Sequence, residues 1–350
     1  MSGLPRGRRP TIADVARAAG VSLSTVDRVL NARAPVRSDT AEQIHAAAES
    51  LGYHAAGVIR ERVRGSRPRR TLGFLLQQPE SGFYRGLARA LTEATESDRS
   101  MQGQAVVEYM TDISPEAVAA RIAALGQHVD ALAVVAADHA LISVEIDRLN
   151  TRGVPVFALV SDLSAPARAG YAGLDHRRVG RTAAWFVTRL ARRPGQIAIF
   201  VGSHRFQCQE LCEMSFRSYV REHAPQFEVL EPLVTLESER LAEEGMHELL
   251  QRHPDLVGFY VAGGGVEGVL RALAAERADG LDSELIGVGH EFMADTRAGL
   301  LAGHLHAVLS VPLALLAERL VARMAGVLAN PALGLQQVVV PLDTQTPESG

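Results

Sequence analysis

Short apolar runs alternate with amphipathic stretches through most of the chain, and this alternation most constrains the fold. From residue 71 onward, helical stretches such as 82–96, 116–125 and 176–191 separate runs that have the length of buried strands. The expected strands are residues 71–76, 104–109, 131–136, 155–160, 196–201, 229–234, 257–261 and 285–288. This rhythm predicts parallel sheets with helices on both faces, either as one large sheet or as two smaller α/β lobes.

The start of the chain follows a different pattern, that of three short helices. Thr11 is expected to cap the first helix, with Asp14 three residues later, and Gly20 to end it. Ser22 caps a second helix after a tight turn, and a third helix ends at Gly52. Such a set predicts a helix-turn-helix unit whose second helix enters the major groove of DNA. A three-helix bundle with no role in DNA binding is the alternative.

Charge is divided unevenly along the chain. All 36 basic residues are arginine, against 40 acidic residues, for a net charge of −4. Residues 1–70 hold 13 arginines and six acidic residues, a net of +7, whereas the remaining residues have a net of −11. This asymmetry suggests a small nucleic-acid-binding segment joined to an acidic domain, with a merely solvated basic terminus as the alternative.

Composition excludes several classes of protein. The chain is 47% hydrophobic and 22% charged, which argues against global disorder. No apolar run reaches the roughly 18 residues of a membrane-spanning helix, and the basic start MSGLPRGRRP lacks the apolar core of a secretory signal. We therefore expect a cytoplasmic protein without a membrane partner. The two cysteines, Cys208 and Cys212, make neither a disulfide framework nor a metal site, and no cofactor is expected.

The second helix carries the residues suited to DNA. Its first turn exposes short hydroxyl side chains and backbone N–H groups, which suit phosphate. Arg28 is the expected base reader, because a guanidinium pairs with both acceptors of guanine. Asp27 either accepts from a cytosine amino group or orients Arg28.

Residues 11–53 resemble the DNA-binding head of the LacI/GalR family of bacterial transcriptional regulators. They carry its T-I-x-D-V-A, A-G-V-S-x-x-T-V, R-V-L-N, V-R-x-x-T and L-G-Y elements at uninterrupted spacing. The resemblance implies DNA-facing roles for Ser22, Leu23, Ser24, Thr25, Arg28, Asn31 and Thr40. We add Thr11, Asp27, Tyr53 and Arg62 to the expected DNA-binding set. Asp27 stands where the family more often has serine, so the base preference there should differ.

The segment after the head departs from that family. There, a short helix wedges an apolar side chain into the minor groove. Here Ala55 and Ala56 replace the usual Pro-Asn pair, and Arg62 holds the position of the wedging leucine. Three interpretations stay open: Val63 takes over in a shifted register, Arg62 reads minor-groove width, or the segment is a linker that forms no helix. Four further arginines, at positions 64, 67, 69 and 70, are expected to attract phosphate.

The rest of the chain resembles the type-1 periplasmic-binding-protein domain of the same family. The stretches F-Y-R-G-L-A-R-A-L, Y-A-G-L-D-H-R-R-V-G-R-T-A-A, H-P-D-L-V-G-F-Y-V-A-G-G-G and G-V-G-H-E carry the resemblance. It implies two doubly wound lobes that close around a small ligand at the carboxyl ends of the strands. The expected ligand-binding residues are Phe83, Tyr84, Asp138, Ser161, Asp162, Arg205, Cys212, Gly264, His290 and Glu291.

Two features of this region bear on the ligand. Cys212 stands where related sequences often have an arginine that reads the ligand, so Arg205 replaces it or the ligand lacks the group it binds. Residues 263–268 satisfy G-x-G-x-x-G between a strand and a helix, and Glu291 ends the next strand. That fingerprint is the basis for an alternative function, that of an NAD(P)-dependent oxidoreductase. No nucleophile, base and oxyanion arrangement emerges, and we expect no catalytic residues.

Together these patterns predict an all-α helix-turn-helix head, residues 1–53, a hinge or linker, residues 54–70, and a two-lobed α/β effector domain, residues 71–350. The expected function is a ligand-responsive transcriptional regulator, in the first instance a repressor. Its expected partners are a pseudo-palindromic double-stranded DNA operator, a sugar-like effector and a second copy of the chain, as a homodimer or a tetramer. A solute-binding protein without a regulatory role is the second alternative.

Overall fold

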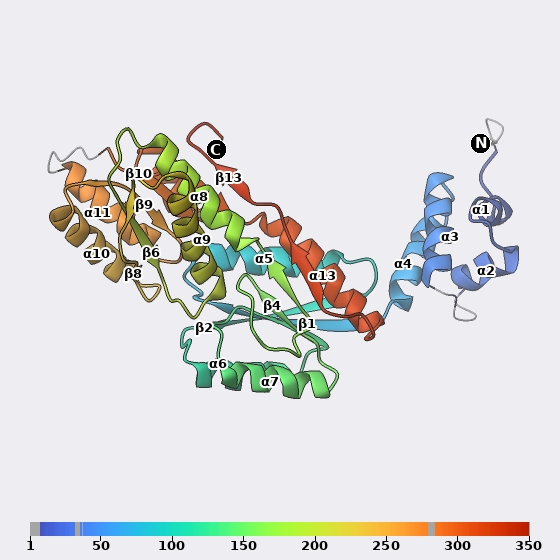
Figure 1. Ribbon diagram of the computed structural model, residues 1–350. Helices are drawn as coiled ribbons and strands as arrows, with labels where there is room; N and C mark the ends of the chain where they lie inside the picture. Colours follow the sequence, from blue (N-terminus) through green and yellow to red (C-terminus); the bar gives the residue numbers. More distant parts are fainter. Residues whose placement is uncertain (1–7, 32–35, 37, 279–283, 350) are drawn as a thin grey trace. The chain divides into compact units, whose positions relative to one another are not determined.

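The computed structural model describes residues 8–31, 36, 38–278 and 284–349. Those residues fall into two compact units, one formed by residues 1–70 with 96–104 and the other by residues 71–95 with 105–350. Helices dominate the first unit, and the second contains two sheets with helices on their faces (Figure 1). Among the described residues, no helix is both long enough and apolar enough to cross a membrane.

Local signals in the sequence explain the helices of the first unit. Thr11 caps the first helix in a full capping box, in which Asp14 accepts from the Thr11 backbone at 2.9 Å. Gly20 and Gly52 follow the first and third helices with φ of +66° and +65°, the left-handed conformation that glycine adopts without strain. The helices are α1 Ile12–Ala18, α2 Leu23–Asn31, α3 Ser38–Ser50 and α4 Ala56–Ser66.

The fourth helix belongs to the hydrophobic core of the head. Ile59 is fully buried and Val63 is 3% exposed, and both pack in one cluster with α1, α2 and α3 residues such as Val26 and Ile44. Ion pairs from Arg60 to Glu49 and from Arg67 to Glu42 join α4 and the segment after it to α3. The segment expected to be a hinge therefore forms a helix, and it packs on α3 and α2 of the head.

Gly57 offers a test of this helix. A Cβ added there meets no atom within 4 Å, and φ is not in the left-handed region. Alanine is therefore expected to stabilise α4 by about 0.5 kcal/mol, because glycine is the poorer helix former and Gly57 lies in the first turn, where the penalty is smaller than in a helix interior. Amide hydrogen exchange in α4 that is slower in Gly57→Ala than in the wild-type chain would show this stabilisation. Gly52→Ala is the matched control and should destabilise the head, since its φ is +65°.

The first sheet of the second unit has six strands in the order β12-β5-β4-β3-β1-β2. Helices α6 and α7 lie on one side of it and α5 and α13 on the other (Figure 1). The strands are β1 Arg69–Gln77, β2 Gln102–Met110, β3 Ala131–Val134, β4 Val156–Leu159, β5 Gly170–Gly173 and β12 Gln336–Val339. The helices are α5 Gly82–Ser97, α6 Pro115–Leu125, α7 Ala140–Thr151 and α13 Leu313–Ala329. We call this sheet and its helices the first lobe.

The second sheet runs in the order β13-β11-β10-β9-β6-β7, and β8 also pairs with β6. Its strands are β6 Gln196–Val201, β7 Glu228–Val229, β8 Leu233–Val234, β9 Leu256–Val261, β10 Ile286–His290, β11 Ala307–Ser310 and β13 Asp343–Gln345. Its helices are α8 His176–Leu190, α9 Gln207–His223, α10 Glu239–Arg252, α11 Val266–Ala278 and α12 Ala294–Leu301. Only β13 pairs antiparallel among the register pairs described. We call this the second lobe.

The chain passes between the two lobes after β5, after β11 and after β12, within the described residues. Two separate sheets confirm the expected two-lobed α/β arrangement over one large sheet. One expected strand is wrong: residues 229–234 form two short strands, because Pro232 between them has no N–H for the ladder. Strands β5, β11, β12 and β13 were not expected, since they are short and β5 contains two glycines.

Candidate functional site

The exposed face of α2 presents hydroxyl groups and one free guanidinium. Val26 and Val29 point into the core of the head, whereas Leu23 is 51% exposed and Ser24 and Arg28 are exposed. The Ser22 hydroxyl accepts from the backbone N–H of Thr25 at 3.2 Å, and it lies 2.9 Å from the Ser24 hydroxyl. Within the described residues, Arg28 has no ion-pair partner. Arg28 can therefore contact DNA without first breaking an ion pair.

Asp27 bonds along the same helix. The Asn31 side-chain nitrogen donates to Asp27 Oδ1 at 2.7 Å, one helical turn away. This bond holds the amide of Asn31, another residue of the expected DNA-binding set, in a fixed direction. The two roles expected for Asp27, base acceptor or orienter of Arg28, stay predictions.

The other residues of the expected DNA-binding set differ in how far they are buried. The Thr11 hydroxyl is used in the cap of α1, where it donates to Asp14 at 2.6 Å. Tyr53 is 7% exposed in the hydrophobic cluster of the head, and Thr40 is half-buried on α3. Arg62 is exposed on α4. Val63 packs in the core, so it cannot serve as a wedge unless α4 leaves α3.

A cavity of about 640 Å³ lies between the two lobes of the second unit. The ends of parallel strands and the starts of the following helices line it, as is usual for ligand sites in open α/β sheets. The first lobe contributes Gln77 at the end of β1, Phe83 and Tyr84 in α5, and Ser161 after β4. The second lobe contributes Cys208, Gln209 and Cys212 of α9, Glu237 before α10, Gly264 before α11, and His290 and Glu291 at the end of β10.

Histidine and cysteine side chains form an uncharged wall of the cavity. His176 Nε2 lies 2.8 Å from the Val160 carbonyl oxygen, and Cys212 Sγ lies 3.8 Å from His176 Nδ1. His290 Nε2 lies 2.6 Å from the Tyr260 hydroxyl. Burial lowers the pKa of His290 to about 3, and it raises the pKa of Cys208 to about 12. At neutral pH these rings and thiols therefore carry no charge.

Two carboxylates lie in the same cavity. Glu237 accepts from Gln209 Nε2 at 2.6 Å and from the Gly264 backbone at 2.8 Å, and burial raises its pKa. Glu291 accepts from the Val311 backbone at 3.5 Å, and burial raises its pKa to about 8. Sequence reasoning missed Glu237, because no periodicity or motif marks the loop after β8 in which it lies.

These pKa shifts predict how stability depends on pH. A glutamate whose folded pKa is raised stabilises the fold below its unfolded pKa of 4.5, and that contribution is lost as pH rises to about 8. Burial lowers the pKa of His290 from 6.5, so this histidine changes the stability with pH only below pH 6.5. Between pH 6.5 and 8, the thermal unfolding midpoint of the second unit should fall, and it should fall less in Glu291→Gln. The control Glu248→Gln, on the surface of α10, should keep the wild-type slope; equal slopes in both variants would contradict the assignment.

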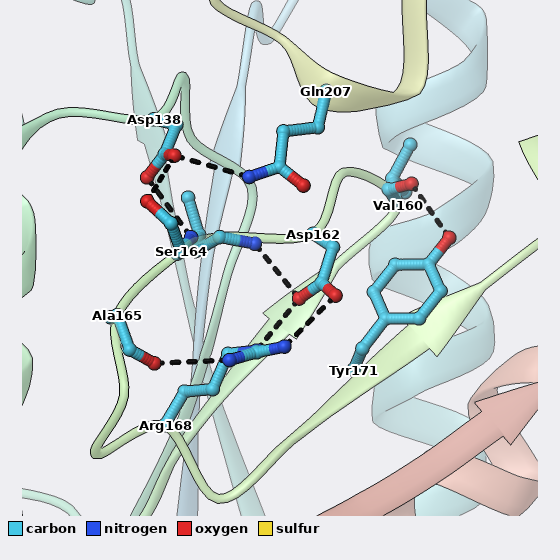
Figure 2. Close-up of polar contacts among 9 residues, drawn as sticks. Asp138, Val160, Asp162, Ser164, Ala165, Arg168, Tyr171 and Gln207 are labelled. Atoms are coloured by element: carbon cyan, nitrogen blue, oxygen red, sulfur yellow. Dashed lines mark hydrogen bonds and ion pairs between the residues drawn. The ribbon is translucent and has the colours of Figure 1, made fainter. Parts of the chain in front are cut away.

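Seven of the ten expected ligand-binding residues line this cavity: Phe83, Tyr84, Ser161, Cys212, Gly264, His290 and Glu291. Asp138 and Arg205 instead line a second cavity of about 310 Å³, and Asp162 lines neither. Local partners hold both aspartates (Figure 2). Asp138 accepts from the Ser164 backbone and from Gln207, each at 3.1 Å.

Asp162 is held by an ion pair in the same loop. Its two carboxylate oxygens accept from Arg168 Nε and Nη2 at 2.8 and 3.1 Å, the bidentate geometry that Figure 2 shows. Arg205 is exposed and lines the smaller cavity, whereas Cys212 lines the larger one.

The glycine turn at residues 263–268 has a packing explanation. Gly265 has a φ of +100°. A Cβ on Gly268 would lie 1.9 Å from the Glu239 carbonyl oxygen, and one on Gly264 would lie 2.1 Å from Glu237 Oε2. The glycines therefore let α11 approach α10 and leave space for Glu237 in the cavity wall.

Comparison with known families accounts for both units. The family of bacterial regulatory proteins called lacI matches residues 11–56, and the periplasmic binding protein domain matches residues 72–330. Over most of its length the chain belongs to the periplasmic binding protein domain family. This domain follows a lacI-family head, which spans α1, α2, α3 and the start of α4. The head matches regulatory proteins and the rest of the chain matches a binding-protein domain, so neither match supports the oxidoreductase alternative.

Several curated relatives are transcriptional regulators. The HTH-type transcriptional regulator MalR of Streptomyces coelicolor is 27% identical over 206 residues, which cover 56% of this chain and 54% of MalR. The maltose regulon regulatory protein MalI of Escherichia coli is 36% identical over 97 residues, 27% of each chain. The catabolite control protein A of Priestia megaterium is 36% identical over 83 residues, 24% of each chain. The match thus spans about half the length of MalR and less of the others.

Solved structures match the second unit in fold. A periplasmic ribose ABC transporter protein from Conexibacter woesei has a TM-score of 0.68 at 19% identity, covering 81% of this chain and 93% of that one. GanP, a glucose-galactose binding protein from Geobacillus stearothermophilus, has a TM-score of 0.69 at 17% identity, covering 79% and 98%. At such identity the match concerns the fold alone.

Proposed function

We propose that this protein is a transcriptional regulator that binds DNA through the exposed face of α2 and a small molecule in the 640 Å³ cavity. One observation carries the proposal: a lacI-family head with a free recognition face is followed in one chain by a ligand-binding fold with an open cavity. A solute-binding protein without a regulatory role would have no use for the head.

The DNA site proposed for it is a pseudo-palindrome. One head offers few base contacts, whereas a specific site must outcompete a large excess of non-specific DNA. When two copies of the chain bind two half-sites, the discrimination ratio of one head against non-specific DNA is squared. A homodimer is therefore the smallest assembly that we expect to bind the site selectively. Selecting the sequences that the full chain binds from a pool of random duplex DNA tests this proposal. Enrichment of an inverted repeat supports the proposal, and binding without sequence preference overturns it.

A sugar or polyol is the proposed class of effector. The relative MalI is a maltose regulon regulatory protein, and the two solved structures above bind or transport sugars by their titles. The cavity offers what hydroxyl groups need, since Gln77, Glu237 and Glu291 bring polar atoms and Tyr84 brings a ring. A thermal-shift screen of sugars and polyols identifies candidates, because a ligand that binds the folded state raises the midpoint.

Gly264→Ala is expected to weaken the response to such a ligand while leaving DNA binding intact. The added Cβ would lie 2.1 Å from Glu237 Oε2, so the carboxylate must leave the Gly264 N–H that it now accepts from. The ligand concentration that gives half of the full change in operator binding should rise about tenfold, because one good polar contact with the ligand is lost. Gly326→Ala is the control, since its Cβ meets only Leu333 at 3.8 Å. Equal responses in the two variants would contradict the role of Glu237.

A further inference from the structure

The segment at the start of α9, in the second lobe, is hydrogen-bonded to the first lobe. The Asp138 backbone N–H, after β3, donates to the Arg205 carbonyl oxygen at 2.8 Å, and Gln207 Nε2 donates to the Asp138 carboxylate at 3.1 Å. The Cys208 backbone N–H donates to the hydroxyl of Ser161, after β4, at 3.3 Å. Groups of the protein itself therefore join the two lobes here.

This segment, residues 205–208, which we call the interlobe segment, also lies between the two cavities. Cys208 lines the larger cavity, Arg205 lines the smaller one, and Phe206 lines both. The interlobe segment is therefore part of the wall that separates the cavities. Its hydrogen bonds to the first lobe hold that wall in place.

The first lobe fixes its side of this contact with bonds of its own. The Asp138 carboxylate accepts from the Ser164 backbone at 3.1 Å as well as from Gln207 (Figure 2). The loop that contains Ser164 is braced by Asp162, whose two oxygens accept from Arg168 at 2.8 and 3.1 Å. The acceptor for the interlobe bond is therefore held in a fixed direction by its own lobe.

The second lobe holds the other side of the contact. His204, which precedes the interlobe segment, lies with Nε2 2.6 Å from Oε2 of Glu213, a carboxylate that is 8% exposed. Glu213 accepts from Arg217 Nε at 2.8 Å. Arg217 in turn donates to the carbonyl oxygens of Val229 and Leu230 at 3.1 and 2.7 Å. The interlobe segment therefore belongs mechanically to the second lobe, and its bonds to the first lobe must break if the lobes separate there.

The contact between α5 and the second lobe is of a different kind. A Cβ on Gly82, at the start of α5, would lie 3.5 Å from the Met293 sulfur, an ordinary van der Waals distance, and both residues line the larger cavity. In the part of the chain that the structure describes, no hydrogen bond or ion pair joins residues 78–95 to the second lobe; Arg85 donates instead to the Pro79 carbonyl of its own lobe at 3.2 Å. Individual van der Waals contacts are weak, so the lobes separate most easily here.

We propose that the interlobe segment fastens the two lobes and, with the chain crossings, forms the axis of their movement, so that the larger cavity opens between α5 and Met293. Asp138 and Gln207 are then positioning residues that set the balance between lobe arrangements. A ligand that prefers a wider arrangement acts against their bond, and one that prefers this arrangement is helped by it. The inference goes beyond the proposed function, because it concerns how the lobes move and holds for any ligand of the larger cavity.

Variants of Gln207 test the fastening in the full chain, without DNA or ligand, so the result is independent of the proposed function. Gln207→Ala removes one interlobe donor, and Gln207→Glu places a second carboxylate against that of Asp138. The backbone amides of Asp138 and Cys208 donate across the lobes, so their hydrogen exchange reports separation at this place. Exchange at both should accelerate about fivefold in Gln207→Ala, the effect of one hydrogen bond, and further in Gln207→Glu.

Exchange of donor and acceptor distinguishes an interlobe bond from a local disturbance of α9. Asp138→Asn combined with Gln207→Glu again pairs an amide with a carboxylate, so exchange at Cys208 should return to near the wild-type rate. Gln251→Ala, at an exposed glutamine of α10, is the control and should leave both amides unchanged. Unaltered exchange in Gln207→Glu, or a double variant that restores nothing, overturns the proposal.

Distances between spin labels test the axis directly. Two pairs of exposed positions serve, Glu80→Cys with Asp295→Cys across the α5 contact and Ala140→Cys with Glu210→Cys across the interlobe segment. The wild-type chain treated with the same label gives the background from the native cysteines. The distance distribution should be broader across the α5 contact, and Gln207→Glu should broaden the distribution across the interlobe segment. Equal widths without that substitution, or a broader distribution across the interlobe segment, would show that the lobes do not pivot there.

Discussion

Replacing Arg28 with alanine is expected to abolish most of the sequence-specific part of DNA binding. Arg28 is exposed on α2 and has no ion-pair partner among the described residues, so its guanidinium is free for a guanine edge. A bidentate arginine–guanine contact is worth about 1–3 kcal/mol of discrimination, and the proposed dimer would lose two such contacts. Operator affinity, measured by fluorescence anisotropy at fixed salt, should fall by about 30-fold or more. Affinity for non-specific DNA should change little.

A second arginine in the head provides the matched control. Arg17 lies on α1, is 78% exposed, and forms an ion pair with Asp14 at 3.5 Å. Arg17→Ala removes the same charge and should weaken specific and non-specific binding equally and slightly, because phosphate attraction carries no sequence information. If both variants weakened specific binding to the same extent, Arg28 would be a phosphate contact rather than a base reader.

Replacing Ile59 with alanine is expected to destabilise the head strongly. Ile59 is fully buried between α4 and the other three helices. Truncation of a buried isoleucine lowers the free energy of unfolding by about 2–5 kcal/mol, a large share of what a small helical unit has. In the full chain, amide hydrogen exchange in α3 and α4 should accelerate by about 30-fold or more, whereas exchange in the second unit should not change.

Val58 is the control for this prediction, since it is the preceding residue of α4 and is 50% exposed. Val58→Ala should change the free energy of unfolding by only about 0.5 kcal/mol. Similar exchange rates in the two variants would mean that α4 does not pack on α3 in solution. The segment would then be the flexible linker that its glycines and arginines allow.

Local signals made the head predictable. Thr11 with Asp14, Gly20 and Gly52 each act within a few residues of the chain, so the helix ends they mark can be derived from the sequence. The burial of Ile59 and Val63 could not be derived from the sequence, because it depends on the complementary surface of α3. A helix with two glycines and several arginines has weak intrinsic propensity, and tertiary packing decides its state.

The cavity was predictable only in part, for a similar reason. Strand ends could be located from the apolar runs, which placed His290 and Glu291 on the cavity wall. Strand ends also hold Asp138 and Asp162, but neighbouring side chains turn both away, and no local pattern reveals Arg168 as a partner. Glu237 lies in an irregular loop, where only the three-dimensional structure shows that it meets Gln209.

Coupling between the cavity and the head is the central claim. A ligand that favours one arrangement of the two lobes shifts DNA affinity only as far as it discriminates between arrangements, and DNA must then change ligand affinity by the same factor. The direct measurement is the operator affinity of the full chain, at fixed salt, with and without the compound that most raises its unfolding midpoint. The account predicts a change of about 5- to 150-fold, and an equal change in ligand affinity when operator is present. Operator and ligand affinities that are independent of one another would contradict it.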